Sequence, residues 1–168
     1  VIEDCLSQFP SYDIAKFDYV LVQGDTATAF GCALAAFNLK AKVIHLEAGL
    51  RTRDLDNPYP EEGYRQMISR IASVNLCPTQ LSEENLKNEG VTNTHVVGNT
   101  VLDNLAKYKG AKGYDNRVLV TLHRRENHPL MDQWFRELDS IAKMYQDDLQ
   151  FILPIHPNPN VLKHKHLL

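Results

Sequence analysis

The chain has 168 residues, of which 43% are hydrophobic and 23% are charged, a composition typical of a globular protein with a buried core. The 18 Lys and Arg residues and 21 Asp and Glu residues give a formal net charge of −3, which argues against a nucleic-acid or anionic membrane surface, and no apolar run approaches the about 20 residues of a membrane span. The three cysteines are widely spaced and odd in number, so they predict neither a disulfide framework nor a zinc site and favour a reducing cytoplasm.

Short β-rich runs alternate with longer helical segments, which is typical of a parallel α/β sheet. The first part of the chain predicts strands at 19–23, 42–46, 74–77 and 94–97. It predicts an Ala-rich helix that ends near residue 39, and further helices at 61–73, 82–89 and 101–107. Gly90 is expected to end the third helix, and Pro58 and Pro60 are expected to keep the loop 51–60 extended.

The composition changes at residues 109–116, which contain two glycines and few apolar side chains. This segment predicts a linker between a first domain at 1–108 and a second at 117–168. The same rhythm resumes after it, with expected strands at 117–122 and 149–155, a helix at 131–145 and a turn at 156–159.

Polar side chains follow four of the predicted strands directly. Asp25, Glu47, His123 and His156 each lie at a carboxyl end. Ligands of open parallel α/β sheets bind outside these ends, so the sequence predicts a ligand site there.

Structural interpretations stay open for two of these residues. Asp25 could cap the helix that follows it. Glu47 ends an apolar strand, where a carboxylate is costly unless it is paired or hydrated, and Arg51 or Arg53 could pair with it.

The charged residues of the later segments have alternatives as well. Glu61 and Arg65 are spaced i and i+4, which is typical of a solvated helix pair. His123 opens a run of three potential cations that suits either a solvated loop or an anion site. His156 lies between Ile155 and Pro157, where a satisfied buried histidine is the default.

Several familiar site patterns are missing from the sequence. Gly24-Asp25-Thr26 lacks the ending of a phosphate-binding P-loop, and no Gly-x-Gly-x-x-Gly fingerprint indicates a nicotinamide cofactor. No serine lies in a nucleophile elbow. Carboxylates with different pKa values in one cleft could instead exchange a proton with carbon, while arginines and a histidine hold a departing diphosphate.

Six short motifs follow one another along the chain: Gly24-Asp25-Thr26, His45-Leu46-Glu47-Ala48-Gly49-Leu50-Arg51-Thr52, Pro60-Glu61-Glu62, Gly98-Asn99-Thr100-Val101-Leu102-Asp103, His123-Arg124-Arg125-Glu126-Asn127 and His156-Pro157-Asn158-Pro159. Their order resembles the non-hydrolysing UDP-N-acetylglucosamine 2-epimerases. The second, third and fifth motifs together are the most specific part of the resemblance, which extends from about Phe17 to Val161.

This resemblance implies an α/β fold with two Rossmann-like parallel-sheet domains in the glycosyltransferase-B arrangement, both incomplete in this chain. It implies interconversion of UDP-N-acetylglucosamine and UDP-N-acetylmannosamine through elimination of UDP to a 2-acetamidoglucal and re-addition on the other face. It also implies a homodimer that needs no redox cofactor and no obligatory metal, and a role in surface polysaccharide synthesis.

The resemblance assigns roles to residues by motif position. It implies catalytic roles for Asp25, Glu47, Glu61 and His123, with His123 near the diphosphate. It implies substrate contacts for Arg51, Arg124, His156 and Asn158. Arg124 and His156 would contact a second, activating UDP-N-acetylglucosamine, and Glu61 would lie between the two sites.

The family is about twice as long as this chain, as a two-domain fold requires. Because the sequence begins with Val1, we expect its first strand to lie upstream and the rest of the second domain downstream, and little turnover by the chain alone. A hydrolysing 2-epimerase, a glycosyltransferase of the same architecture and a non-catalytic remnant are the alternatives.

Overall fold

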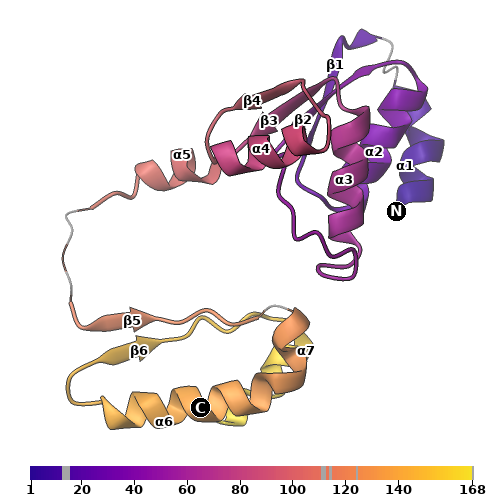
Figure 1. Ribbon diagram of the computed structural model, residues 1–168. Coiled ribbons are helices and arrows are strands. Elements are labelled where there is room, and N and C mark those ends of the chain that lie inside the picture. Colours follow the sequence, from indigo (N-terminus) through magenta and orange to yellow (C-terminus); the bar gives the residue numbers. More distant parts are fainter. Residues whose placement is uncertain (13–15, 111–112, 114, 124, 168) are drawn as a thin grey trace. The chain divides into compact units, whose positions relative to one another are not determined.

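The computed structural model describes the chain from residue 1 to 167, except for 13–15, 111–112, 114 and 124. The chain divides into two compact units, which we call the first unit (Val1–Lys109) and the second unit (Gly110–Leu168). The division falls inside the segment for which the sequence predicts a linker. Figure 1 shows a parallel sheet and its helices in each unit.

The first unit contains a four-stranded parallel sheet in the order β1-β2-β3-β4. Its strands are β1 (Tyr19–Gln23), β2 (Lys42–Leu46), β3 (Val74–Cys77) and β4 (Thr94–Val96). Its helices are α1 (Ile2–Gln8), α2 (Ala27–Asn38), α3 (Glu61–Ile71), α4 (Gln80–Asn88) and α5 (Val101–Ala106). Helix α1, which the sequence analysis did not predict, packs on α2.

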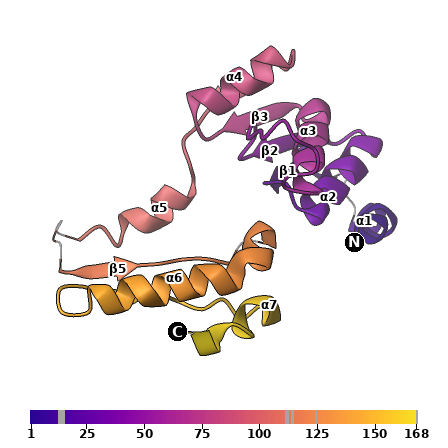
Figure 2. The ribbon, with the colours of Figure 1, turned by 60° about the horizontal axis from the view of Figure 1, so that its bottom comes forward.

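One face of this sheet carries the core. Successive side chains of a strand point to opposite faces, so that Val22, Val43 and Cys77 are buried, whereas Leu21, the neighbour of Val22 on β1, is 58% exposed. Helices α2, α3 and α4 each connect two neighbouring parallel strands. Because such crossover connections are right-handed, all three helices lie on the same face of the sheet. Figure 2 gives a second view of these helices. The small side chains of α2 let it approach the sheet closely, and Ala33 and Ala36 are fully buried.

The loop between β2 and α3 differs from its prediction. Residues 55–60 form turns, so the expected extended conformation is wrong for that half of the loop. Helix α3 nevertheless begins at Glu61, as predicted, and Gly90 follows α4 with a φ of +79°, as predicted for a glycine that ends a helix.

The second unit is a smaller β-α-β arrangement. Strand β5 (Arg117–Leu119) pairs in parallel with β6 (Gln150–Ile152), and both are shorter than predicted. Helix α6 (Met131–Met144) joins them, α7 (Pro159–Leu162) follows β6, and 3-10 turns cover Arg125–Leu130 and Lys165–Leu167. Its core is formed by Met131, Phe135 and Val161.

The predicted fold class, α/β with two parallel Rossmann-like sheets, is confirmed. Among the residues that the structure describes, no helix combines the length and the apolar character that are needed to cross a bilayer.

Candidate active site

Three carboxylates from separate segments lie together at the carboxyl edge of the first unit's sheet. The amide of Gly24 donates to the carbonyl of Leu46 (3.0 Å), which joins the turn after β1 to the end of β2. A Cβ built at Gly24 would lie 3.8 Å from Oε2 of Glu47. The charges of Glu61 and Glu47 both act on Asp25 and raise its pKa. The structure therefore brings together Asp25, Glu47 and Glu61.

The turn between β1 and α2 aims Asp25 at this edge. The side chain of Thr26 accepts a hydrogen bond from the amide of Ala29 (3.1 Å) and caps α2, so the interpretation of Asp25 as the cap is wrong. Gly24 has a φ of +71°, a conformation that glycine adopts without steric cost. Nε2 of the buried His45 donates to the carbonyl of Gly24 (2.9 Å) and holds the turn from below.

Glu47 has an unusual backbone and an unpaired side chain. Its φ of +66° lies in the left-handed region, which costs a residue with a side chain about 1–2 kcal/mol. Neither proposed partner pairs with it, because Arg51 donates to Glu89 (2.8 and 2.9 Å) and Arg53 donates to Asn85 (3.4 Å). In the described part of the chain its carboxylate makes no hydrogen bond or ion pair. Strained residues of this kind cluster at functional sites.

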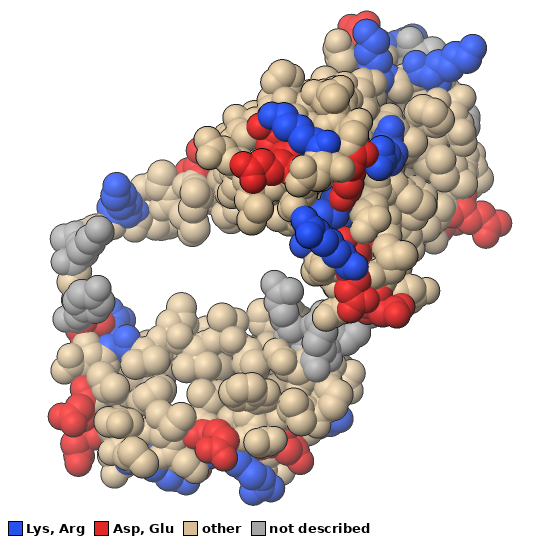
Figure 3. Space-filling model, viewed as in Figure 1, with Lys and Arg blue, Asp and Glu red and all other residues tan. Residues whose placement is uncertain are grey.

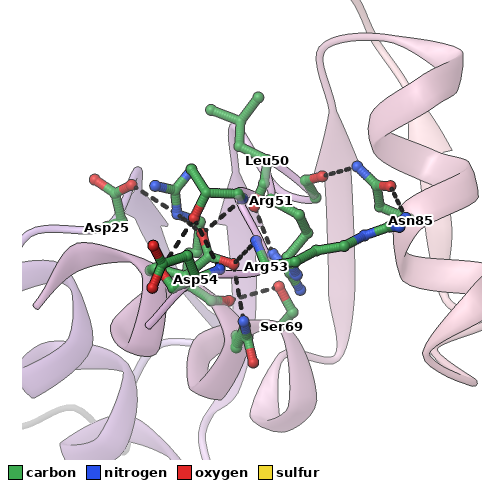
Figure 4. Close-up of polar contacts among 12 residues, drawn as sticks. Asp25, Leu50, Arg51, Arg53, Asp54, Ser69 and Asn85 are labelled. Carbon is green, nitrogen blue, oxygen red and sulfur yellow. Dashed lines mark hydrogen bonds and ion pairs between the residues drawn. The ribbon is translucent and has the colours of Figure 1, made fainter. Parts of the chain in front are cut away.

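The hydrogen bonds of the Arg51 guanidinium go to Glu89 and to the backbone, not to the three carboxylates. The side chain of Arg51 is 1% exposed, and its remaining terminal nitrogen donates to the carbonyl of Leu50 (2.8 Å). The amide of Asn85 donates to the carbonyl of Gly49 (3.1 Å) and ties α4 to the same turn. Figure 4 shows Leu50, Arg51 and Asn85 in the same view as Asp25.

Glu62 is a buried polar residue that the sequence analysis did not single out. Its carboxylate accepts hydrogen bonds from the amides of Thr52 (3.1 Å) and Arg53 (3.2 Å) and from Nε2 of Gln66 (2.8 Å). Burial acts to raise the pKa of Glu62, but these hydrogen bonds and the charge of Arg65 together lower it below its ordinary value. Charged residues on the core-facing side of the predicted helix were the signal that could have found it.

Arg65 joins Glu62 to the carboxylates. Its Nε lies 3.3 Å from Oδ2 of Asp25 and 3.1 Å from Oε2 of Glu62, so the interpretation of Arg65 as the solvated partner of Glu61 is wrong. Burial raises the pKa of Asp25, Arg65 lowers it, and the neighbouring carboxylates raise it, which leaves it above its ordinary value. Figure 3 shows acidic and basic side chains interspersed on the visible face of the first unit.

The second unit brings two of the predicted histidines together. The rings of His123 and His156 stack with centroids 4.9 Å apart and an interplanar angle of 18°. His156 is exposed and its Nδ1 accepts from the amide of Asn158 (3.1 Å), so the interpretation as a buried histidine is wrong. Oδ1 of Asn158 accepts from the amide of Asn160 (2.9 Å) and caps α7. Arg124 lies outside the described residues.

Comparison of the sequence with known families gives one match over nearly the whole chain. A family model described as UDP-N-acetylglucosamine 2-epimerase matches residues 6–166. The UDP-N-acetylglucosamine 2-epimerase of Campylobacter jejuni is 40% identical over 171 residues, which cover 88% of this chain and 45% of that protein. The Bacillus subtilis enzyme is 40% identical over 166 residues, covering 90% of this chain and 43% of the relative.

Solved structures give the same family. The chain superposes on the UDP-GlcNAc 2-epimerase of Neisseria meningitidis bound to UDP-GlcNAc with a TM-score of 0.86 and 34% identity, covering 99% of this chain and 51% of that one. The Methanocaldococcus jannaschii enzyme in complex with UDP-GlcNAc and UDP gives a TM-score of 0.75 and 32% identity, covering 99% and 50%. The chain thus spans about half the length of the relatives that it matches. It belongs to the UDP-N-acetylglucosamine 2-epimerase family.

Proposed function

We propose that the complete protein interconverts UDP-N-acetylglucosamine and UDP-N-acetylmannosamine, and that this chain supplies the acid–base half of the site. The observation that carries the proposal is the convergence of Asp25, Glu47 and Glu61 at one sheet edge, with Glu47 strained and unpaired. Two of the similar solved structures, from Neisseria meningitidis and Methanocaldococcus jannaschii, are complexes with UDP-GlcNAc, which supports the substrate class.

The chemistry needs more than one carboxylate. One carboxylate takes the proton from carbon 2, the electron pair forms the carbon 1–carbon 2 double bond, and the bond from carbon 1 to the UDP oxygen breaks. UDP then adds back to carbon 1 while a proton reaches carbon 2 on the opposite face. Acid–base groups with separated pKa values suit such a reaction, and the raised pKa of Asp25 fits a group that carries a proton.

The second unit supplies the groups that we propose for the diphosphate. UDP carries its negative charge on phosphate oxygens, and protonated imidazoles or arginines stabilise the charge that develops as it departs. We place His123 at the diphosphate, and His156 and Arg124 at a second, activating UDP-N-acetylglucosamine. The Oδ1 atom of Asn158 is occupied by the cap of α7, so the amide nitrogen is the group left for a ligand.

We assign Arg51 a structural role instead of a substrate contact. All of its guanidinium nitrogens donate within the chain, to Glu89 and to the carbonyl of Leu50. This ion pair stabilises the turn that follows Glu47.

The test is exchange at carbon 2. The complete protein, incubated with UDP-N-acetylglucosamine in heavy water, is expected to return both UDP-sugars with deuterium at that carbon. Asp25→Asn and Glu47→Gln are expected to lower turnover much more than substrate binding, whereas Glu84→Gln, an exposed residue of α4, serves as the matched control. Retention of full turnover in both site variants would remove these residues from the chemistry.

Other outcomes identify the alternatives. Accumulation of free N-acetylmannosamine would indicate a hydrolysing epimerase. Turnover without deuterium at carbon 2 would indicate a glycosyltransferase. The isolated chain is expected to show little turnover, and failure of the complete protein to bind UDP-N-acetylglucosamine would indicate a non-catalytic remnant.

We also propose that the complete protein is a homodimer that works in the reducing cytoplasm. The odd number and wide spacing of the three cysteines in the sequence support that compartment. Sedimentation of the complete protein tests the dimer, and a sigmoidal dependence of rate on UDP-N-acetylglucosamine tests activation by a second molecule.

A further inference from the structure

We propose that Arg65 is a positioning residue, which fixes the place and the charge of the Asp25 carboxylate, and that Glu62 holds Arg65 there. The inference rests on the proposed function, in which Asp25 exchanges a proton with the substrate. It concerns two residues of α3 to which the motif resemblance gave no role.

Nε of Arg65 lies between two carboxylates that differ in their exposure to solvent. Nε of Arg65 is 3.3 Å from Asp25 and 3.1 Å from Glu62. The side chain of Glu62 is fully buried, that of Arg65 is 10% exposed, and that of Asp25 is 29% exposed. Exposure thus rises from Glu62 to Asp25, so the ion pair runs from the core toward the sheet edge. Burial keeps water from screening the inner part of this pair.

Glu62 is an anchor because its own position does not depend on Arg65. It already accepts hydrogen bonds from the amides of Thr52 and Arg53 and from Gln66. The amides belong to the loop after β2, and Gln66 lies one turn along α3. A carboxylate fixed from two segments gives Arg65, three residues along the same helix, a stationary partner.

Nε of Arg65 is within ion-pair distance of both carboxylates but is hydrogen-bonded to neither. This buried nitrogen makes no aligned hydrogen bond with any other described group either. A shared donor can turn toward Asp25 when that group ionises and relax toward Glu62 when it is protonated. This suits a carboxyl group that must change its charge during turnover.

A purely structural ion pair between Arg65 and Glu62 is the competing explanation. It predicts that removal of Arg65 changes stability but leaves the titration of Asp25 unchanged. Our proposal predicts a change in that titration, because Arg65 opposes the effects of burial and of the neighbouring carboxylates on Asp25. The titration therefore separates the two explanations.

The experiment follows the side-chain carboxyl carbon of Asp25 by NMR across a pH titration of this chain. Arg65→Met is expected to raise the pKa of Asp25 by about one unit or more, since a neighbouring arginine typically lowers an aspartate by 1–3 units. Arg65→Lys keeps the cation and is expected to restore most of the shift. Arg51→Met is the matched control, because it removes a buried arginine whose partner is Glu89, and it is expected to leave the titration unchanged.

A second measurement needs no variant of Arg65 and so avoids the risk of misfolding. In the unmodified chain, the Nε–H resonance of Arg65 is expected to shift with the midpoint of the Asp25 titration, and Asp25→Asn is expected to abolish that shift. An unchanged pKa of Asp25 in a folded Arg65→Met chain would overturn the inference. An Arg65 Nε–H resonance that does not shift with the Asp25 titration would do the same.

Activity separates this inference from the proposed function. In the complete protein, Arg65→Met is expected to lower kcat more than it raises KM and to move the acidic limb of the pH profile with the Asp25 titration, and Arg65→Lys is expected to return the limb toward its wild-type position. Exchange at carbon 2 without coupling between the two residues would refute the positioning role alone. Coupling without exchange would refute the proposed function alone.

Discussion

The two units support their candidate site residues in different ways. In the first unit, Asp25 and Glu47 lie above buried polar groups, with His45 holding one turn and Glu62 holding the next loop. In the second unit, the exposed rings of His123 and His156 stack on each other, above a core of three buried side chains. The comparison teaches that the carboxylates are tied to buried groups that stabilise the first unit, whereas the stability of the second unit depends little on its exposed imidazoles.

The largest loss of stability in the first unit is expected from a substitution in the turn after Glu47. Gly49 has a φ of +87°, and a Cβ there would lie 2.1 Å from the carbonyl oxygen of Ser82. Gly49→Ala is expected to lower the free energy of unfolding by about 3 kcal/mol or more, from the left-handed backbone and the overpacking together. Urea unfolding followed by circular dichroism measures this.

Gly90→Ala is the matched control for that prediction. Gly90 has a similar φ of +79°, but nothing lies within 4 Å of a Cβ there. A loss of about 1 kcal/mol is expected from the backbone alone. Equal losses at the two glycines would show that the contact with Ser82 has no energetic weight.

The next largest loss of stability is expected at the buried carboxylate of Glu62. Glu62→Gln keeps one oxygen acceptor but places an amide donor against the backbone amides of Thr52 and Arg53, and a loss of about 2 kcal/mol is expected. Glu61→Gln, at the neighbouring position, is expected to change stability by less than about 0.5 kcal/mol. If both variants lost the same amount, the anchoring role of Glu62 would be wrong.

The pH dependence of the Glu62 contribution has a definite sign. The pKa of Glu62 is lower in the folded chain than its ordinary value of 4.5, so the carboxylate stabilises the fold fully above that value. The contribution is lost as the pH falls from 4.5 through the folded pKa. The difference in urea midpoint between the wild type and Glu62→Gln is therefore expected to shrink on acidification below pH 4.5. A difference that grew on acidification would contradict this sign.

Smaller losses of stability are expected at two ion pairs, one buried in the first unit and one exposed in the second. Arg51→Met in the first unit removes a buried guanidinium that donates twice to Glu89, and a loss of about 1–2 kcal/mol is expected. Lys143→Met in α6 removes an exposed pair with Asp139, which is expected to change stability by less than about 0.5 kcal/mol. Addition of 1 M salt to the wild type should weaken only the exposed pair.

The smallest effect is expected at the stacked histidines. His123→Ala and His156→Ala are each expected to cost no more than about 0.5–1 kcal/mol, the value of a single aromatic pair. Trp134, the chain's single tryptophan, lies in α6 and reports by fluorescence on the unfolding of the second unit. A loss well above this range would show that the pair is part of the second unit's framework.

The sequence alone predicted much of the fold. The bounds of β1, β2 and β3 agree with the predicted strands, because a short apolar run between turn residues is a local signal in the sequence. The extended conformation of the loop after β2 was predicted wrongly for residues 55–60, which form turns. Proline suits a turn as well as extended backbone, so the two prolines alone did not decide between them. Helix α1 was missed, since its packing on α2 is a long-range contact.

For the candidate site, the sequence by itself determined which residues stand at strand ends and at the start of α3, because chain order and the hand of parallel crossovers bring those positions to one edge. Only the tertiary structure decided the partner of each charge: Arg65 meets Asp25 and Glu62, and Arg51 meets Glu89. Ion pairing depends on distances of a few ångströms between segments that are far apart in the chain. Sequence spacing offers several partners of equal plausibility, and packing selects one of them.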